Sequence, residues 1–482
     1  MSEPVINTIL TGRKLIAFAI VWDVIFTAAV PFMNLGYSVN SANLNYASMG
    51  YRAVMYLHGL LVAYVATLAL IVCELFTING RSMQGHARAV IRYSALFGVL
   101  LGGIGGIVNF GYINASGIGI INDMPTWIQI ASFLALDEMA VALLAFLVTA
   151  PKSAGVGYKN AGLPYYLLTL SVASALIGAI MGHLGGWIIA FGNLPAPFSG
   201  YVSWLGLDTT TFAANLVGSH SHEMAVALMA GIVALTAQRF GYSRLGKKGR
   251  SLARLGLAVA ITGVILMTGV YVAAGAYNYS IPTLFVSGPN GANGIAFDDL
   301  LTGLVGMGAL LLAIALIGPW YRKVYGSNPA KAAVLTTWII AILTVPVLGY
   351  WIEMNESFYG AGGSIAGAAG AATDATYMIF HQQLAFFVMP ALAAAILAMD
   401  YYLKSERKKK ILSLAAIGGS WLSFAGGISY VFVSPAGANI FLVLEYAGAA
   451  VIALSALVVA LYLFGALEDR DALGGQQPPT AT

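Results

Sequence analysis

Five of the six histidines in this chain stand inside long apolar stretches, where an imidazole has few structural uses. They are His58, His183, His220, His222 and His381, while the sixth, His86, lies in a basic segment and is expected to be a solvated surface residue. Imidazole nitrogen is a ligand that suits iron, copper and zinc. Hydrogen bonding between helices is the structural alternative for each histidine taken singly.

Two of these histidines are two positions apart, in the stretch "NLVGSHSHEMAVALMAG" at residues 215–231. On a helix, positions i and i+2 point about 200° apart, at roughly 100° per residue. His220 and His222 are therefore expected to face two different sites, unless one of them is structural.

Carboxyl side chains also interrupt the apolar stretches, at Asp23, Asp137, Glu138, Glu223 and Glu445. A carboxylate at membrane depth is costly and is a functional candidate by default. Glu223 would orient an imidazole on another helix or accept a proton from a substrate. Asp23 and Glu138 lie nearer the middle of the membrane and would relay protons. A hydrogen-bonded, purely structural role is the alternative for each.

The composition shows what kind of solvent these residues occupy. The 482 residues are 59% hydrophobic and 9% charged, whereas a soluble protein carries about 25% charged residues. A chain this apolar needs a lipid bilayer around it, and no nucleic-acid partner is expected. The single cysteine, Cys73, excludes a disulfide framework, a thiolate zinc site and a cysteine-held iron–sulfur cluster.

The hydropathy pattern predicts an all-α membrane protein with twelve transmembrane helices, each about 20 residues or longer. The predicted spans are 13–34, 51–77, 93–113, 126–150, 164–192, 211–236, 254–277, 298–318, 332–352, 374–400, 411–433 and 439–465. Lysine and arginine concentrate in alternate connecting segments, so the positive-inside rule predicts that both termini are cytoplasmic. Residues 1–467 would form one transmembrane domain and residues 468–482 a disordered cytoplasmic tail, without a cleavable signal peptide. The expected location is the plasma membrane.

This topology places all five apolar-stretch histidines at one depth. They come from four helices and lie roughly 10–17 Å below the outer surface, at about 1.5 Å per residue. A shared layer of imidazoles fits a haem held by axial ligands from two helices. Glycines in "LHGL" and "GHLGGW" would leave room for a flat macrocycle, although close helix packing explains them equally. Arg52, above His58, would hold a haem propionate or anchor the interface.

Twelve spans with histidines high on spans 2, 6 and 10 resemble subunit I of the haem–copper oxidase superfamily. In that family a span-2 histidine and the second histidine of a span-10 H-x-H motif hold the low-spin haem. His58 in "MYLHGLLVAY" and His381 in "MIFHQQLAFF" match those two positions. The resemblance covers nearly the whole chain as topology, while its motifs match in part.

The departures from the family concern the oxygen-reducing centre. The first position of the span-10 motif is Ile379, and the predicted span 254–277 contains no histidine where the family has its copper ligands. No copper is therefore expected. The H-x-H motif stands on span 6 instead, and His183 is an additional histidine on span 5. Because spans 2, 6 and 10 are related by approximate threefold symmetry in the family, His220 and His222 would serve two neighbouring pores.

The resemblance then implies two b-type haems, with His58, His381, His183 and His222 as the iron ligands. The first choice of pairing is His58 with His381, and His183 with either His222 or His220. A scaffold without the copper site is similar to the membrane b-type cytochrome subunits of archaeal respiratory complexes.

Such a subunit would pass electrons from quinol through haem b, near the outer face, to a Rieske-type or other cytochrome subunit. A haem-containing terminal oxidase or nitric oxide reductase with a relocated active site is the second hypothesis. A proton or metal transporter without haem is the third. Whether the chain is itself an enzyme, as a quinol-oxidising subunit of a larger complex, stays open.

Overall fold

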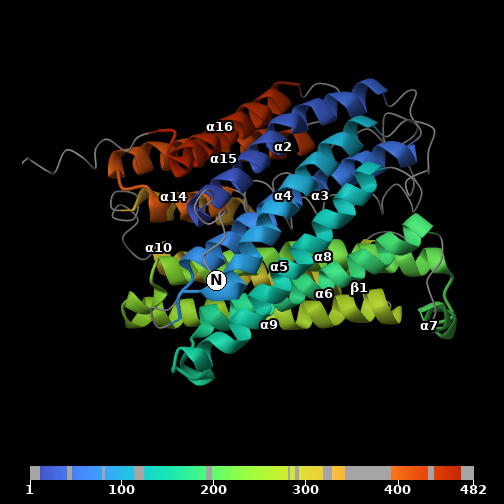
Figure 1. Cartoon of the computed structure of the whole chain (residues 1–482), viewed down its shortest axis with the longest axis horizontal. Helices are drawn as coiled ribbons and strands as arrows, with labels where there is room; N and C mark the ends of the chain where they lie inside the picture. The colour runs from blue at the N-terminus through green and yellow to red at the C-terminus, as the bar shows by residue number, and fades with distance from the viewer. Residues whose placement is uncertain are drawn as a thin grey trace, which may run out of the picture.

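The structure is a computed structural model of the chain, shown in Figure 1. It describes residues 11–40, 46–78, 82–112, 124–191, 198–279, 283–287, 293–317, 328–341, 392–432 and 439–467. Two of the sites expected from the sequence fall outside this part. His381 lies in the segment 342–391, and the side chain of Arg52 is not among those described.

Long helices make up nearly all of the described chain. They are α2 (Gly12–Asn40), α3 (Tyr46–Leu75), α4 (Gly85–Tyr112), α5 (Met124–Ser153), α6 (Leu163–Phe191), α8 (Thr209–Arg239), α9 (Lys247–Tyr277), α10 (Phe297–Ile317), α15 (Glu406–Phe432) and α16 (Asn439–Phe464). Shorter elements join them: η2 (Tyr158–Asn160), α7 (Phe198–Trp204), η3 (Tyr242–Arg244), β1 (Thr283–Ser287), β2 (Asn293–Ala296) and α14 (Leu392–Tyr402).

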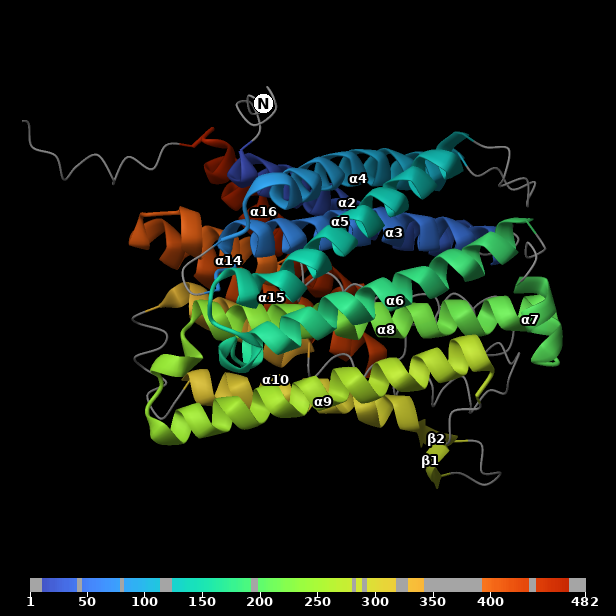
Figure 2. The ribbon, with the colours of Figure 1, turned by 60° about the horizontal axis from the view of Figure 1, so that its bottom comes forward.

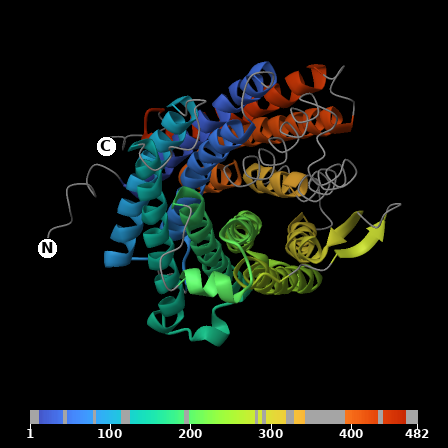
Figure 3. The ribbon, with the colours of Figure 1, turned by 90° about the vertical axis from the view of Figure 1, so that its right-hand side faces the viewer.

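The helices pack in two groups that meet along the middle of the molecule. One row runs α15, α16, α2, α3, α4 and α5, each helix contacting the next, and the other runs α6, α8, α9 and α10. Contacts of α3 with α8 and of α5 with α6 join the two groups. Figure 2 and Figure 3 show the long helices aligned in one direction, with α3, α5, α6 and α8 side by side. The histidine-bearing helices therefore meet at this junction.

Nine of the described helices are long and apolar enough to cross a membrane. They correspond to nine of the expected spans, the second to the eighth, the eleventh and the twelfth. Helix α2 lies on the first expected span, and two shorter apolar helices, Pro329–Ala341 and Leu392–Tyr402, overlap the ninth and tenth. A multi-pass, predominantly helical membrane protein is thus what the structure supports.

Close packing between the helices depends on glycine at several positions, as in membrane bundles generally. Helices α9 and α10 approach so closely that a Cβ atom on Gly308 would lie 2.5 Å from the carbonyl oxygen of Gly256. The reciprocal Cβ on Gly256 would lie 2.6 Å from the carbonyl oxygen of Gly308. A backbone atom cannot move aside, so these two positions accept no larger residue.

Two elements were not expected from the sequence. Strands β1 and β2 pair as an antiparallel hairpin, with Thr283 opposite Ala296. The strand sequence "TLFVS" contains the β-branched and aromatic residues that strands favour, but a hydropathy search for spans treats it as a loop. A hairpin of five and four residues adds to the predominantly helical fold expected from the sequence and leaves its class unchanged. The short helix α7 is the second addition, and it lies at the same end of the molecule as the hairpin (Figure 2).

The opposite end of the molecule carries paired charges. Glu74 of α3 accepts from Arg88 at 2.5 Å and from Arg92 at 2.8 Å, both on α4. Arg239, in the last turn of α8, binds Asp400 of α14 at 2.7 Å. These pairs hold neighbouring helices together at the end where the basic connections lie.

Candidate functional site

Helix α8 carries the H-x-H motif, and its first turn is fixed by Asp208. The carboxylate of Asp208 accepts hydrogen bonds from the backbone N–H and the hydroxyl of Thr211, at 2.9 and 2.7 Å. These bonds hold the pKa of Asp208 below its usual value, and the bond from the hydroxyl has the larger effect. Asp208 is thus an N-cap of the kind that satisfies the unpaired amides at a helix start.

The centre of the candidate site is a pair of imidazoles from two helices. His58 on α3 and His220 on α8 have ring centroids 6.2 Å apart and ring planes within 9° of parallel. Two metal–nitrogen bonds of about 2 Å, with about 1 Å from each nitrogen to its ring centre, also add up to about 6 Å. In separation alone, this stacked pair therefore matches two axial ligands of one metal atom.

His220 is held in place by the backbone of α6. Its Nδ1 lies 2.9 Å from the carbonyl oxygen of Gly178. A Cβ atom on Gly182, one turn later, would lie 2.5 Å from the same nitrogen, so the ring packs directly against that glycine. Because a carbonyl oxygen only accepts, Nδ1 carries the proton and Nε2 carries the lone pair. Metal-binding histidines are anchored in this way.

A carboxylate–imidazole contact lies next to the pair. Nε2 of His183 on α6 is 2.7 Å from Oδ2 of Asp137 on α5, and both side chains are partly exposed. The ring of Phe133 stands between His183 and His58, with centroids 6.0 and 5.3 Å away. His58, His220 and His183 thus form one cluster on α3, α8 and α6.

His222 faces away from this cluster. Its Nδ1 is 3.0 Å from the carbonyl oxygen of Gly218 on the same helix, and its ring lies 5.9 Å from that of Tyr271 on α9. The residue is exposed, unlike His220. The two histidines of the motif therefore serve opposite sides of α8, as their helical spacing requires.

The three carboxylates expected to move protons lie at separate places. Glu223 on α8 is fully buried and accepts from the Ser174 hydroxyl at 3.2 Å. Asp23 on α2 is also buried and lies 3.5 Å from the Thr67 hydroxyl. Glu138 on α5 is exposed and accepts from the Ser94 hydroxyl at 3.1 Å.

The described residues supply two imidazole donors at this place. No group of three or more His, Cys, Asp or Glu side chains in the described part of the chain is placed to hold a metal ion. The His58–His220 pair supplies two ligands, and a haem needs only axial ligands from the protein because its macrocycle supplies the others. Two imidazoles are thus the number of axial ligands that a haem can take from a protein.

Sequence reasoning missed three features of this cluster. Phe133 gave no signal, because an aromatic residue in an apolar helix usually packs in the bilayer or the core. The glycines of "GHLGGW" were expected to leave room for a macrocycle, whereas the ring of His220 fills the space beside Gly182. Asp137 and His183 were each recognised as polar residues at membrane depth, but their contact with each other was not.

Comparison with known proteins adds nothing to this geometry, since no family model, curated protein or solved structure matches the chain.

Proposed function

We propose that this chain is a membrane b-type cytochrome of a respiratory chain, built like a haem–copper oxidase subunit I without its copper site. It would take electrons from a quinol and pass them through haem b to a Rieske-type or other cytochrome subunit. The observation that carries the proposal is the near-parallel His58–His220 pair, 6.2 Å between ring centroids on two helices.

His58 and His220 would hold this haem, and a b-type haem supplies reversible one-electron transfer when bound. His220 is prepared for the task, because the Gly178 carbonyl fixes its tautomer and ring orientation. This pairing replaces the first choice from the sequence, His58 with His381. A second haem would draw on the remaining histidines, His183, His222 and His381; His183 and His222 lie on different sides of α8, and Nε2 of His183 already contacts Asp137.

Protons released from quinol need acceptors inside the bundle. Glu223 is the nearest candidate along α8, three residues from His220, and it is buried among hydroxyls. Ser174 lies 2.7 Å from the hydroxyl of Thr268, which extends the hydrogen-bonded chain from α6 to α9. Asp23 lies further off and would serve a separate path.

The orientation that we propose places the basic end of the bundle in the cytoplasm of a cell bounded by its plasma membrane. Helices α3 and α8 both begin at the other, outer end. His58 is the thirteenth residue of α3 and His220 the twelfth residue of α8, counted from those first residues. At 1.5 Å per residue the pair then lies about 17 Å from the outer ends of these helices. An electron acceptor would dock on that outer face.

The test is an optical spectrum of the purified, dithionite-reduced protein, with variants compared at equal protein concentration. We expect sharp reduced b-type bands, and each of His58→Ala and His220→Ala should abolish the signal of one haem. His222→Ala changes an exposed imidazole on the same helix, so it should retain the His58–His220 haem. A spectrum without haem, or one that His220→Ala leaves unaltered, would reject the proposal.

A further inference from the structure

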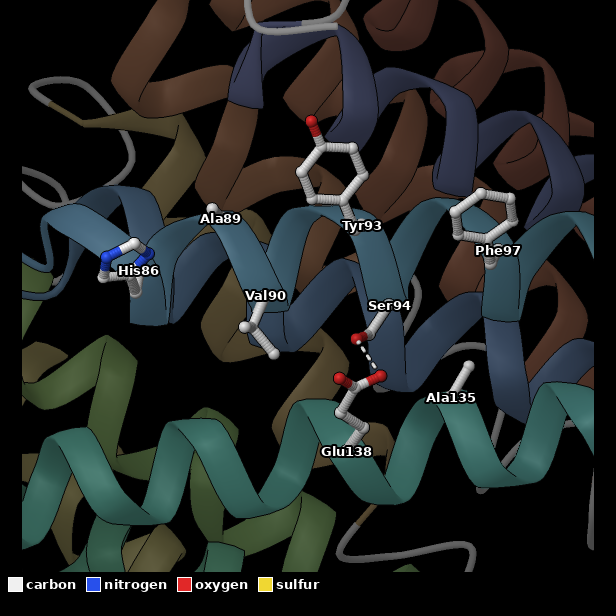
Figure 4. Close-up of a pocket in the computed structure, with 8 residues that line it drawn as sticks. All are labelled: His86, Ala89, Val90, Tyr93, Ser94, Phe97, Ala135 and Glu138. Carbon is white, nitrogen blue, oxygen red and sulfur yellow. Dashed lines mark hydrogen bonds between the residues drawn. The ribbon is translucent and has the colours of Figure 1, made fainter. Parts of the chain in front are cut away.

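A lipid-facing pocket lies between α4 and α5, separate from the imidazole cluster. Its cavity volume is about 330 Å³, at the lower end of the range of roughly 300–1,000 Å³ for small-molecule sites. The lining residues are His86, Ala89, Val90, Tyr93, Ser94 and Phe97 of α4, with Ala135 and Glu138 of α5 (Figure 4). The α4 residues recur every three or four positions, so they share one helix face.

The pocket opens toward the bilayer. Helix α5 has the most exposed of the described membrane spans, with 22% of its apolar window buried. Phe97 on α4 is 51% exposed and Leu134, beside Ala135 on α5, is 60% exposed. A ligand would therefore reach the pocket from the lipid phase.

Glu138 makes this lipid-facing pocket polar. A carboxyl group on the lipid side of an apolar helix is costly and functional by default. It reaches from α5 toward α4, where the Ser94 hydroxyl donates to it at 3.1 Å (Figure 4). Ser94 thus holds one oxygen of this carboxyl, about a third of the way along α4, and the carboxyl is the group that a ligand would bind. The ligand should thus be a lipid-soluble molecule with a small hydrogen-bonding head.

The pocket also has a polar mouth and a connection to the imidazoles. His86 lines it at the second residue of α4, and Ser94 lies eight residues, or about 12 Å, deeper. Asp137, the neighbour of Glu138, binds His183 on another side of α5. Pocket and cluster are hence separated by one helix, about 10 Å across.

We propose that this pocket binds the head group of a membrane quinone, with a ring oxygen on the carboxyl of Glu138, which Ser94 holds in place, and the isoprenoid tail in the bilayer beside Phe97. The choice of a quinone rests on the proposed function. A quinone carbonyl accepts a hydrogen bond from a protonated carboxyl, and a quinol hydroxyl donates to a carboxylate, so Glu138 would serve both forms while Ser94 orients it.

The pocket is tested by photolabelling the full chain in lipid nanodiscs with an azido-benzoquinone that carries a ten-carbon tail. We expect the label on peptides containing residues 86–97 or 135–138, and competition by the unlabelled decyl quinone. Ala135→Phe, which fills the cavity, should lower labelling at least tenfold. Val141→Phe adds an aromatic ring at an exposed position, about one turn beyond Glu138 on α5, and should leave labelling unchanged.

A second measurement identifies the role of Glu138. The hydrophobic reagent dicyclohexylcarbodiimide should modify Glu138, and the decyl quinone should protect it, whereas decanoic acid and decanol should not. Equal protection by the simple amphiphiles would assign the pocket to lipid and overturn the proposal. Equal labelling of Ala135→Phe and the unaltered chain would also overturn it. The haem spectrum of the same samples separates the two ideas, since quinone labelling without haem rejects the cytochrome but not the pocket.

Discussion

A single glycine decides where the imidazole of His220 can lie. Gly182 of α6 has no side chain, and the ring occupies the space where a Cβ atom would be, 2.5 Å from Nδ1. Since that nitrogen also bonds to the Gly178 carbonyl, moving the ring breaks its anchor as well as its packing. The position of the ligand is therefore set by a residue that has no functional group.

We accordingly expect Gly182→Ala to remove the bands of the His58–His220 haem and to lower the free energy of unfolding by about 1–3 kcal/mol, the usual cost of overpacking. The matched control is Gly186→Ala on the same helix, where no atom lies within 4 Å of the added Cβ. It should retain both haem and stability. The reduced spectrum and thermal unfolding in detergent measure these effects. Identical behaviour of the two variants would contradict the placement of His220.

At the scale of residues, the sequence indicated which side chains belong to the candidate site, but not which of them contact each other. Five imidazoles in apolar stretches and carboxylates at membrane depth are visible as chemical exceptions in a hydrophobic chain. The contact of His58 with His220 depends on α3 lying against α8, and the contact of His183 with Asp137 depends on the register of α5 against α6. Neither follows from periodicity along one helix. The role expected of His381 stays a prediction, because that residue lies outside the described part.

At the scale of elements, the start of α8 depends on charge. The folded protein lowers the pKa of Asp208, so the carboxylate form stabilises the fold. Its contribution is fully present above the ordinary pKa of about 3.9 and is lost as the pH falls through the lower, folded value. Acid should therefore loosen the first turn of α8.

Hydrogen-exchange protection of the amides at residues 210–212, followed from pH 6 to pH 2, measures this effect. In the unaltered chain we expect protection to fall at the acid end of this range. Asp208→Asn should stay protected at all pH values, because asparagine caps a helix without titrating. Asp208→Ala should be weakly protected throughout. An acid dependence that persists in the asparagine variant would assign it to another group.

The elements themselves were largely predictable, because long apolar runs in a membrane protein have only one common structure. Helix α7 and the β1–β2 hairpin were not, since both are short and lie in a connection between spans. Hydropathy averaged over a span cannot resolve elements of five or seven residues. Their presence reflects local turn and strand preferences instead.

At the scale of the whole molecule, the orientation in the membrane is open to a direct test. The only native thiol, Cys73, is buried, so it should give little background with a maleimide. Cysteines placed at the exposed Ser199 of α7 and Lys248 of α9 lie at opposite ends of the bundle. A membrane-impermeant maleimide on intact cells should label Ser199→Cys at once and Lys248→Cys only after permeabilisation. The reverse order would invert the topology and move the imidazole pair to the cytoplasmic half.

Helix α7 would anchor one end of the molecule at the membrane–water interface. Tyr201 donates its hydroxyl to the Ala276 carbonyl at the end of α9, which fastens α7 to the bundle, and Trp204 is 75% exposed. Together with the exposed rings of Tyr277 and Tyr279, these residues resemble the aromatic belts that sit among lipid head groups. A thicker or thinner bilayer would then be accommodated at the far end, by tilting or local deformation. The imidazole pair would keep its distance from the anchored surface in any host membrane.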